Sequence, residues 1–155
     1  MNGDDDMQDF SLPATGGKTF HWRDARGKKL VVYFYPKDDT SGCTLESADF
    51  RDRYPEFERL GTEIVGISRD SLSSHEKFKA KLGLPFALLA DTEEKVCQLF
   101  EVMKQKKLYG KEVRGIERST FLFDESGQLI NEWRGISASG HVENVLETLK
   151  SLTEK

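Results

Sequence analysis

The strongest structural signal in this sequence is an unbroken run of six apolar or aromatic residues at positions 30–35. Because polar residues do not alternate with them, the run predicts a strand buried on both faces, at the centre of a sheet covered by helices. Residues 36–42 then have the composition of a polar loop, and helical spacing of apolar side chains begins at Cys43. We expect Pro55 to kink or end that helix.

The rest of the chain alternates strands and helices. Ser73 and Glu76 form a capping box that opens a helix, and Gly83 can close it. The predicted elements, in order, are a strand over 30–35, a helix from 43, a strand over 64–67, a helix over 73–83, a strand over 86–90, a helix from 91, a β-hairpin over 120–133 and a helix over 142–152. This order predicts an α/β fold with a central mixed β-sheet flanked by helices, compatible with a thioredoxin-like layout.

Length and charge narrow the possible classes of protein. A chain of 155 residues is the size of one domain, so we predict a single domain over 1–155 with a short acidic N-terminal segment over 1–8. The net charge of −4 gives no basic excess, which argues against nucleic-acid binding. No apolar run approaches the ~20 residues of a membrane-spanning helix, and the acidic N-terminus is unlike a signal peptide. We therefore expect a cytoplasmic protein without a membrane partner.

Cys43 lies where a thiolate would be stabilised. It follows a buried strand and falls in the predicted first turn of a helix, where free backbone N–H groups and the helix dipole favour negative charge. Gly42 leaves the sulfur uncrowded, Thr40 can direct its hydroxyl at the sulfur, and Pro36 fixes the backbone and shields one side of the pocket. The alternative is a buried cysteine that acts as a small hydrophobe, but the polar residues 37–41 favour a reactive thiol.

The spacing Pro36-x-x-x-Thr40-x-x-Cys43 matches the active-site motif of the peroxiredoxins. The wider stretch 33–46 resembles the bacterioferritin-comigratory, or peroxiredoxin Q, branch of that family. The resemblance extends to further segments at 9–13, 50–52, 65–68, 109–111 and 115–122. It implies a thioredoxin fold and an antioxidant enzyme that reduces hydroperoxides with a cysteine thiolate.

The resemblance also assigns roles to individual residues. Cys43 falls on the peroxidatic cysteine, Thr40 on its hydroxyl partner and Pro36 on the residue that shields the pocket. Arg118 falls on an arginine that reaches across from a distant strand, and Glu46, one turn after the cysteine, could hold it in place. The thiolate would attack one peroxide oxygen and become a sulfenic acid. Because sulfur carries the redox chemistry, we expect no metal, haem or flavin.

Regeneration of the thiol is where this chain departs from the family. Many members of the branch carry a resolving cysteine five residues after the first, but here that position is Ala48. Others carry it on the helix expected over 73–82, which contains no cysteine. Only Cys97 remains, at the edge of an apolar helical face, where an inert packed thiol is favoured and an atypical resolving role stays open. We therefore expect an external reductant, which could be thioredoxin, glutaredoxin or a low-molecular-weight thiol. A monomer is expected from the resemblance.

Other interpretations stay open beside the peroxidase. A non-catalytic thioredoxin-fold redox switch or holdase could use Cys43 as a regulatory thiol, and the pH dependence of its alkylation would distinguish the two. Disulfide exchange is disfavoured because Thr40 stands where a C-x-x-C motif would begin.

Two further features of the sequence are expected to be structural only. The basic stretch over 104–114 is expected to be a solvated loop, with docking of an acidic protein reductant as a weaker alternative. The scattered histidines, His21, His75 and His141, are expected to be solvated, and a second histidine for a helical zinc motif is missing.

Overall fold

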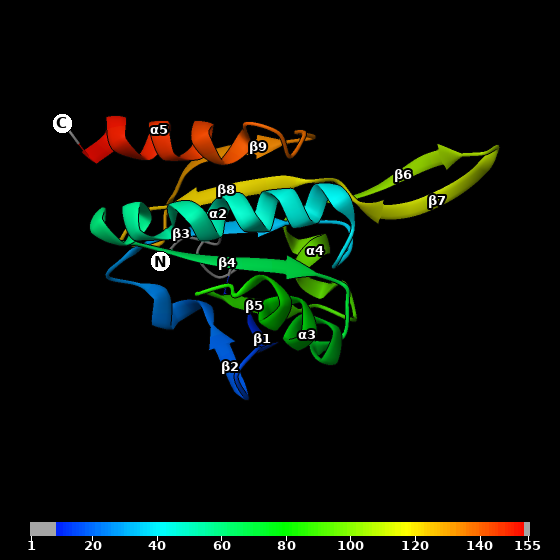
Figure 1. Ribbon diagram of the computed structural model, residues 1–155, viewed down its shortest axis with the longest axis horizontal. Coiled ribbons are helices and arrows are strands. Elements are labelled where there is room, and N and C mark those ends of the chain that lie inside the picture. The colour runs from blue at the N-terminus through cyan, green and yellow to red at the C-terminus, as the bar shows by residue number, and fades with distance from the viewer. Residues whose placement is uncertain (1–8, 154–155) are drawn as a thin grey trace.

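The computed structural model describes residues 9–153, which form a seven-stranded sheet, a separate two-stranded ribbon and the helices packed around them (Figure 1). The strands are β1 (Ser11–Ala14), β2 (Lys18–His21), β3 (Lys29–Phe34), β4 (Thr62–Ser68), β5 (Ala87–Ala90), β6 (Met103–Leu108), β7 (Lys111–Ile116), β8 (Ser119–Phe123) and β9 (Leu129–Arg134). The helices are the 3₁₀-helix η1 (Trp22–Ala25) and the α-helices α2 (Ser41–Arg59), α3 (Leu72–Leu82), α4 (Lys95–Leu99) and α5 (His141–Thr153).

The sheet confirms the predicted mixed α/β architecture. Its strand order is β2-β1-β5-β4-β3-β8-β9, with β3 parallel to β4 and antiparallel to β8. Alternate residues of β3 point to opposite faces, so Val32 and Phe34 enter one apolar core while Val31 and Tyr33 enter the other. Helices η1 and α4 contribute to the first core, and α2, α3 and α5 contribute to the second. Strand β3 therefore lies inside the sheet, between β4 and β8, and is buried on both faces as predicted.

Helix α2 carries the candidate nucleophile. It begins at Ser41, two residues before the predicted start, with Thr40 at the N-cap position, so Cys43 lies in its first turn as expected. Of the two outcomes expected at Pro55, a kink or the end of the helix, the second is wrong, because α2 continues to Arg59. A proline within a helix removes one hydrogen bond, and burial of Phe57 beyond it offsets that cost.

The start of α3 differs from the prediction in its capping residue. Ser71, not Ser73, is the N-cap, and its side chain accepts a hydrogen bond from the Ser74 N–H at 3.2 Å. Glu76 accepts instead from the backbone N–H of Gly16, on the turn between β1 and β2, at 2.9 Å. Because this partner is 60 residues away, no local pattern could reveal it. The predicted end is confirmed, since Gly83 closes the helix at φ 64°.

Strands β6 and β7 form a ribbon that extends away from the body of the protein, next to the N-terminal end of α2 (Figure 1). The expectation of a loop over this basic stretch is therefore wrong. Tyr109 and Gly110 form its tip with φ values of 54° and 79°, which suit a two-residue hairpin turn. Because neither face of the ribbon covers a large core, its sequence lacks the apolar alternation that would have revealed it.

Two predictions extend beyond what the structure describes. The acidic segment over residues 1–8 lies outside the described residues, and the single domain over 1–155 stays a prediction. Within residues 9–153, no helix is both long and apolar enough to cross a membrane.

Candidate active site

The site is built where β3 ends and α2 begins. Cys43 is fully buried beside the second core, yet it occupies the first turn of α2, whose N-terminal N–H groups have no intrahelical acceptors. This placement combines a low-dielectric environment with the positive end of the helix dipole. Both features strengthen any hydrogen bond made to a charged sulfur.

Arg118 approaches the sulfur from the segment between β7 and β8. Its Nη2 donates to Cys43 Sγ at 3.4 Å, and its Nη1 donates to Glu46 Oε1 at 2.6 Å. The guanidinium therefore bridges two side chains of the first two turns of α2. A Cβ atom on Gly42 would lie 3.0 Å from Nη2 of Arg118, so a side chain at this position would require the guanidinium to shift by a few tenths of an ångström. The structure thus brings Arg118, Glu46, Gly42 and Cys43 together.

Thr40 and Pro36 lie in the segment that leads into α2, and the Thr40 hydroxyl has a different partner from the one expected. The Thr40 hydroxyl donates to the backbone carbonyl of Lys37 at 3.0 Å, so its proton is directed at the loop and not at Cys43. Pro36 is the second residue after the end of β3 and is half-buried. The carbonyl of Thr40 accepts the Thr44 N–H at 2.8 Å, which places Thr40 as the residue that starts the helix.

Cys97 lies apart from this site, in the core on the opposite face of the sheet, whereas Cys43 adjoins the second core. Both thiols are free and buried. Burial and the neighbouring Asp91 carboxylate raise the pKa of the Cys97 thiol far above its ordinary value. The Asp91 side chain also accepts the Cys97 N–H at 2.7 Å. Cys97 is therefore a neutral, packed thiol, which is the interpretation that the sequence favoured.

Glu46 is the most unusual titratable group of the site. It is fully buried, and its Oε2 has no hydrogen-bond partner within residues 9–153. Burial raises its pKa to about 7, although Arg118 opposes the shift. At neutral pH, Glu46 is therefore ionised in some molecules and protonated in others. The ionised carboxylate neutralises the Arg118 guanidinium, whereas the protonated carboxyl leaves the guanidinium charge available to stabilise a charged sulfur.

A buried histidine near Glu46 was not anticipated. His141, the first residue of α5, is buried and its Nε2 is hydrogen-bonded to Thr120 Oγ1 at 2.7 Å. Burial and the charge of Arg118 lower its pKa to about 4, so it is neutral near pH 7 and its 3.9 Å approach to Glu46 Oε2 is not an ion pair. The expectation that the histidines are solvated is wrong for His141 and for His75, and His21 alone is exposed.

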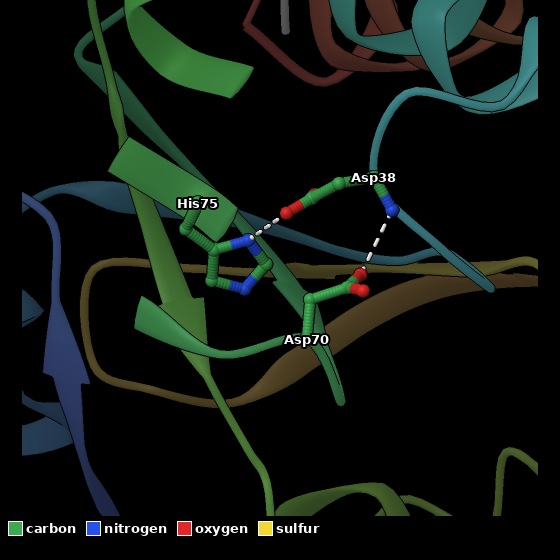
Figure 2. Close-up of side chains that lie close together, drawn as sticks. All are labelled: Asp38, Asp70 and His75. Carbon is green, nitrogen blue, oxygen red and sulfur yellow. Dashed lines mark hydrogen bonds and ion pairs between the residues drawn. The ribbon is translucent and has the colours of Figure 1, made fainter. Parts of the chain in front are cut away.

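His75 belongs to a second polar cluster, with Asp38 and Asp70, beside the loop that leads into α2 (Figure 2). One ligand-type atom from each lies within 4.8 Å of the others, which is close enough to hold a cation. However, a metal-binding imidazole needs an unprotonated nitrogen, and both ring nitrogens of His75 face hydrogen-bond acceptors. Hydrogen bonds within the protein therefore account for this cluster.

The raised pKa of Glu46 predicts how stability depends on pH. The native state retains the Glu46 proton up to about pH 7, whereas the unfolded chain releases it near the ordinary value of 4.5. Between these values the native state binds more protons, so the free energy of unfolding falls as pH rises. We expect this fall to be roughly 3 kcal/mol and to be absent in Glu46→Gln. Urea unfolding of both proteins from pH 4.5 to 8 measures it, and parallel curves would contradict the assignment.

A mixed sheet that presents a buried cysteine at the first turn of a helix, with an arginine on its sulfur, defines a thiol-based redox protein of the thioredoxin-like class. Comparison with known proteins narrows the class. The pattern of the AhpC/TSA family matches residues 4–131. Peroxiredoxin Bcp of Bacillus subtilis is 50% identical over 147 residues, which cover 95% of this chain and 94% of that protein.

Solved structures agree with the sequence comparison. The bacterioferritin comigratory protein of Xanthomonas campestris superposes with a TM-score of 0.90 at 46% identity, covering 95% of this chain and 94% of that one. Peroxiredoxin Q of Xylella fastidiosa superposes with a TM-score of 0.90 at 38% identity, covering 97% and 92%. The chain belongs to the AhpC/TSA family and, within it, to the peroxiredoxins of the Bcp or peroxiredoxin Q type. It is a thiol peroxidase that uses a hydroperoxide substrate and a thiol or thioredoxin-type reductant, and nothing in the comparisons favours a non-catalytic redox switch.

Proposed function

We propose that Cys43 is the peroxidatic cysteine and that Arg118, held by Glu46, stabilises both its thiolate and the reacting peroxide. The observation that carries this proposal is the guanidinium bridge, 3.4 Å from Sγ and 2.6 Å from Glu46 Oε1. Thr40 and Pro36 shape the turn from which Cys43 emerges. In this proposal, Thr40 contributes its hydroxyl to the peroxide only after leaving the Lys37 carbonyl.

The reaction follows from these positions. The Cys43 thiolate attacks one peroxide oxygen, an S–O bond forms and the O–O bond breaks, so sulfur is oxidised to the sulfenic acid and the peroxide is reduced. The leaving alkoxide or hydroxide takes up a proton and departs as an alcohol or water. Because negative charge moves from sulfur to the leaving oxygen, a cation fixed beside both atoms lowers the barrier.

The substrates proposed are hydrogen peroxide and small organic hydroperoxides. The solved Xanthomonas campestris relative is described by its alkyl peroxide reduction activity. A buried sulfur that belongs to the same apolar cluster as Tyr33 and Phe50 is consistent with a substrate that carries a small apolar group.

We further propose that an external thiol regenerates Cys43. The reductant thiol attacks the sulfenic sulfur, water leaves, and a second thiol resolves the mixed disulfide. Cys97 is a poor resolving residue because it lies in the core on the other face of the sheet, and a disulfide requires α-carbons within about 7 Å. The reductant would be thioredoxin, glutaredoxin or a low-molecular-weight thiol. A monomeric state, a cytoplasmic location and the absence of nucleic-acid and membrane partners stay predictions.

The test is to trap the first oxidation. Reduced protein is mixed with one equivalent of hydrogen peroxide, quenched with an alkylating reagent within seconds, and analysed by intact mass and peptide mapping. We expect oxidation confined to Cys43, as a sulfenic acid or a mixed disulfide with added thiol. A Cys43–Cys97 disulfide would overturn external regeneration only, whereas an unreacted Cys43 thiol would overturn the assigned site and favour a regulatory thiol.

A further inference from the structure

The loop between β3 and α2 is fastened to α3 through the buried side chain of Asp38. Its Oδ2 lies 2.7 Å from His75 Nδ1 (Figure 2). The same oxygen accepts a hydrogen bond from the Ser74 hydroxyl at 2.8 Å. Its Oδ1 accepts from the Tyr35 hydroxyl at 2.5 Å. His75 is fully buried, and its other ring nitrogen, Nε2, lies 2.9 Å from the backbone carbonyl oxygen of Leu89 on β5.

The partners of His75 fix where its protons must be. A carbonyl oxygen only accepts hydrogen bonds, so the contact with Leu89 requires a hydrogen on Nε2. An ionised carboxylate also only accepts, so the contact with Asp38 requires a hydrogen on Nδ1. A neutral imidazole carries one of these hydrogens, and only the imidazolium carries both.

The surroundings support an ionised Asp38. Burial alone would raise the pKa of Asp38, but the hydrogen bonds from His75 and Tyr35 outweigh it and hold the pKa below its ordinary value. Burial raises the pKa of Tyr35 well above 10, so the phenol stays neutral and donates its hydrogen. The remaining charged group of the cluster is the Asp70 carboxylate, which accepts the Asp38 N–H at 2.8 Å and the Ser68 hydroxyl at 2.6 Å. Two carboxylates and a neutral phenol favour a cation between them.

We propose that His75 is a positioning residue, a buried imidazolium whose pair with Asp38 holds the loop in the shape that places Cys43 against Arg118. This inference rests on the proposed role of Cys43. Asp38 lies five residues before the cysteine, and the pair attaches the loop to α3 and β5 at once. Asp39, the next residue, has φ 65°, a strained conformation for a residue other than glycine that persists only where its surroundings hold it.

Loss of either hydrogen from His75 would break this arrangement. Without the Nδ1 hydrogen, the Asp38 carboxylate would face the lone pair of Nδ1. Without the Nε2 hydrogen, the Leu89 carbonyl oxygen would face the lone pair of Nε2. In either case the loop loses a charge-assisted bond.

Nuclear magnetic resonance of the wild-type protein tests the protonation state directly. Protein labelled with ¹⁵N in its histidines is examined at pH 7.5, and His75→Asn identifies the signals of that residue. We expect both ring nitrogens of His75 to show the shifts and attached hydrogens of an imidazolium. Among the other histidines, His141 should show one unprotonated nitrogen, because its pKa is lowered to about 4. An unprotonated nitrogen on His75 at this pH would overturn the proposal.

Reaction kinetics test the positioning role. His75→Asn retains a donor near the position of Nδ1, whereas His75→Leu removes both donors. We expect the rate constant of Cys43 with hydrogen peroxide to fall about tenfold or more in His75→Leu and to be partly restored in His75→Asn. Asp38→Asn combined with His75→Leu should be no worse than His75→Leu alone, because the two residues act as a unit.

A matched control uses the same loop and helix. Lys81→Gln removes an exposed ion pair between Lys81 Nζ and Asp39 Oδ1, 2.7 Å apart, and should leave the rate constant unchanged. Wild-type rates in a folded His75→Leu protein, or an equal loss in Lys81→Gln, would overturn the positioning role. Failure of the proposed function would look different, since the wild-type Cys43 itself would then not react with peroxide.

Discussion

Replacing Cys43 with serine is expected to abolish peroxide reduction, lowering kcat/KM by about 10⁴-fold or more, the scale seen when a catalytic nucleophile is removed. A serine hydroxyl is a far weaker nucleophile than a thiolate and cannot be oxidised to a sulfenic acid. The substitution changes one buried atom, and Arg118 keeps its bond to Glu46 at 2.6 Å, so the fold should persist. Turnover is measured by peroxide consumption in the presence of a thiol reductant.

The other cysteine provides the matched control. Cys97→Ser makes the same chemical change in the core on the opposite face of the sheet. We expect its first oxidation step and its turnover with an external thiol to match the wild type. If Cys97→Ser reacts once with peroxide at the normal rate but cannot turn over, regeneration by an external thiol would be wrong.

Replacing Arg118 with lysine is expected to lower the rate constant of Cys43 with peroxide by about 10²–10³-fold, the cost of losing one preorganised donor to a developing negative charge. Lysine keeps the positive charge, but one ammonium cannot reproduce the planar fork that donates Nη1 to Glu46 and Nη2 to Cys43. Stopped-flow measurement of the single oxidation step isolates this loss from regeneration.

Arg134→Lys is the control for this change. Arg134 lies on β9, where its guanidinium sits 4.9 Å from the centre of the Phe121 ring and donates to the carbonyls of Phe100 and Glu101. Because these contacts lie away from Cys43, we expect its oxidation rate to stay near that of the wild type. Equal losses in both variants would indicate a general disturbance of the sheet and contradict a specific role for Arg118.

Much of the site was predictable because its chemistry depends on neighbours in sequence. The apolar run over 30–35 predicted the strand β3, and the helical spacing that follows it predicted Cys43 and Glu46 on the first turns of one helix. Arg118 was anticipated from the family resemblance, since an isolated arginine before a strand is usually a surface residue. Its contacts with residues 72 and 75 positions away come from the pairing of β8 with β3.

The buried histidines could not be predicted, because their hydrogen-bond partners are distant in the sequence. The partners of His75 are 37 residues earlier, at Asp38, and 14 residues later, at Leu89. Thr120, the partner of His141, is 21 residues earlier. Histidine occurs on surfaces and in cores alike, so the choice depends on whether the fold supplies partners. The Thr40 hydroxyl shows the same limit at short range, because the Lys37 carbonyl competes for its hydrogen.

The β6–β7 ribbon has a consequence for how the protein behaves at high concentration. Within residues 9–153, neither outer edge of this two-stranded ribbon is paired with another strand, and unpaired edges are templates for aggregation. Lysines at positions 104, 107 and 111 are exposed along it, where like charges on two approaching copies repel one another. These lysines, which made the stretch look like a solvated loop, therefore disfavour edge-to-edge pairing of the ribbons of two molecules. Acetylation of these lysines would leave the ribbon intact and remove that protection against fibrous assembly.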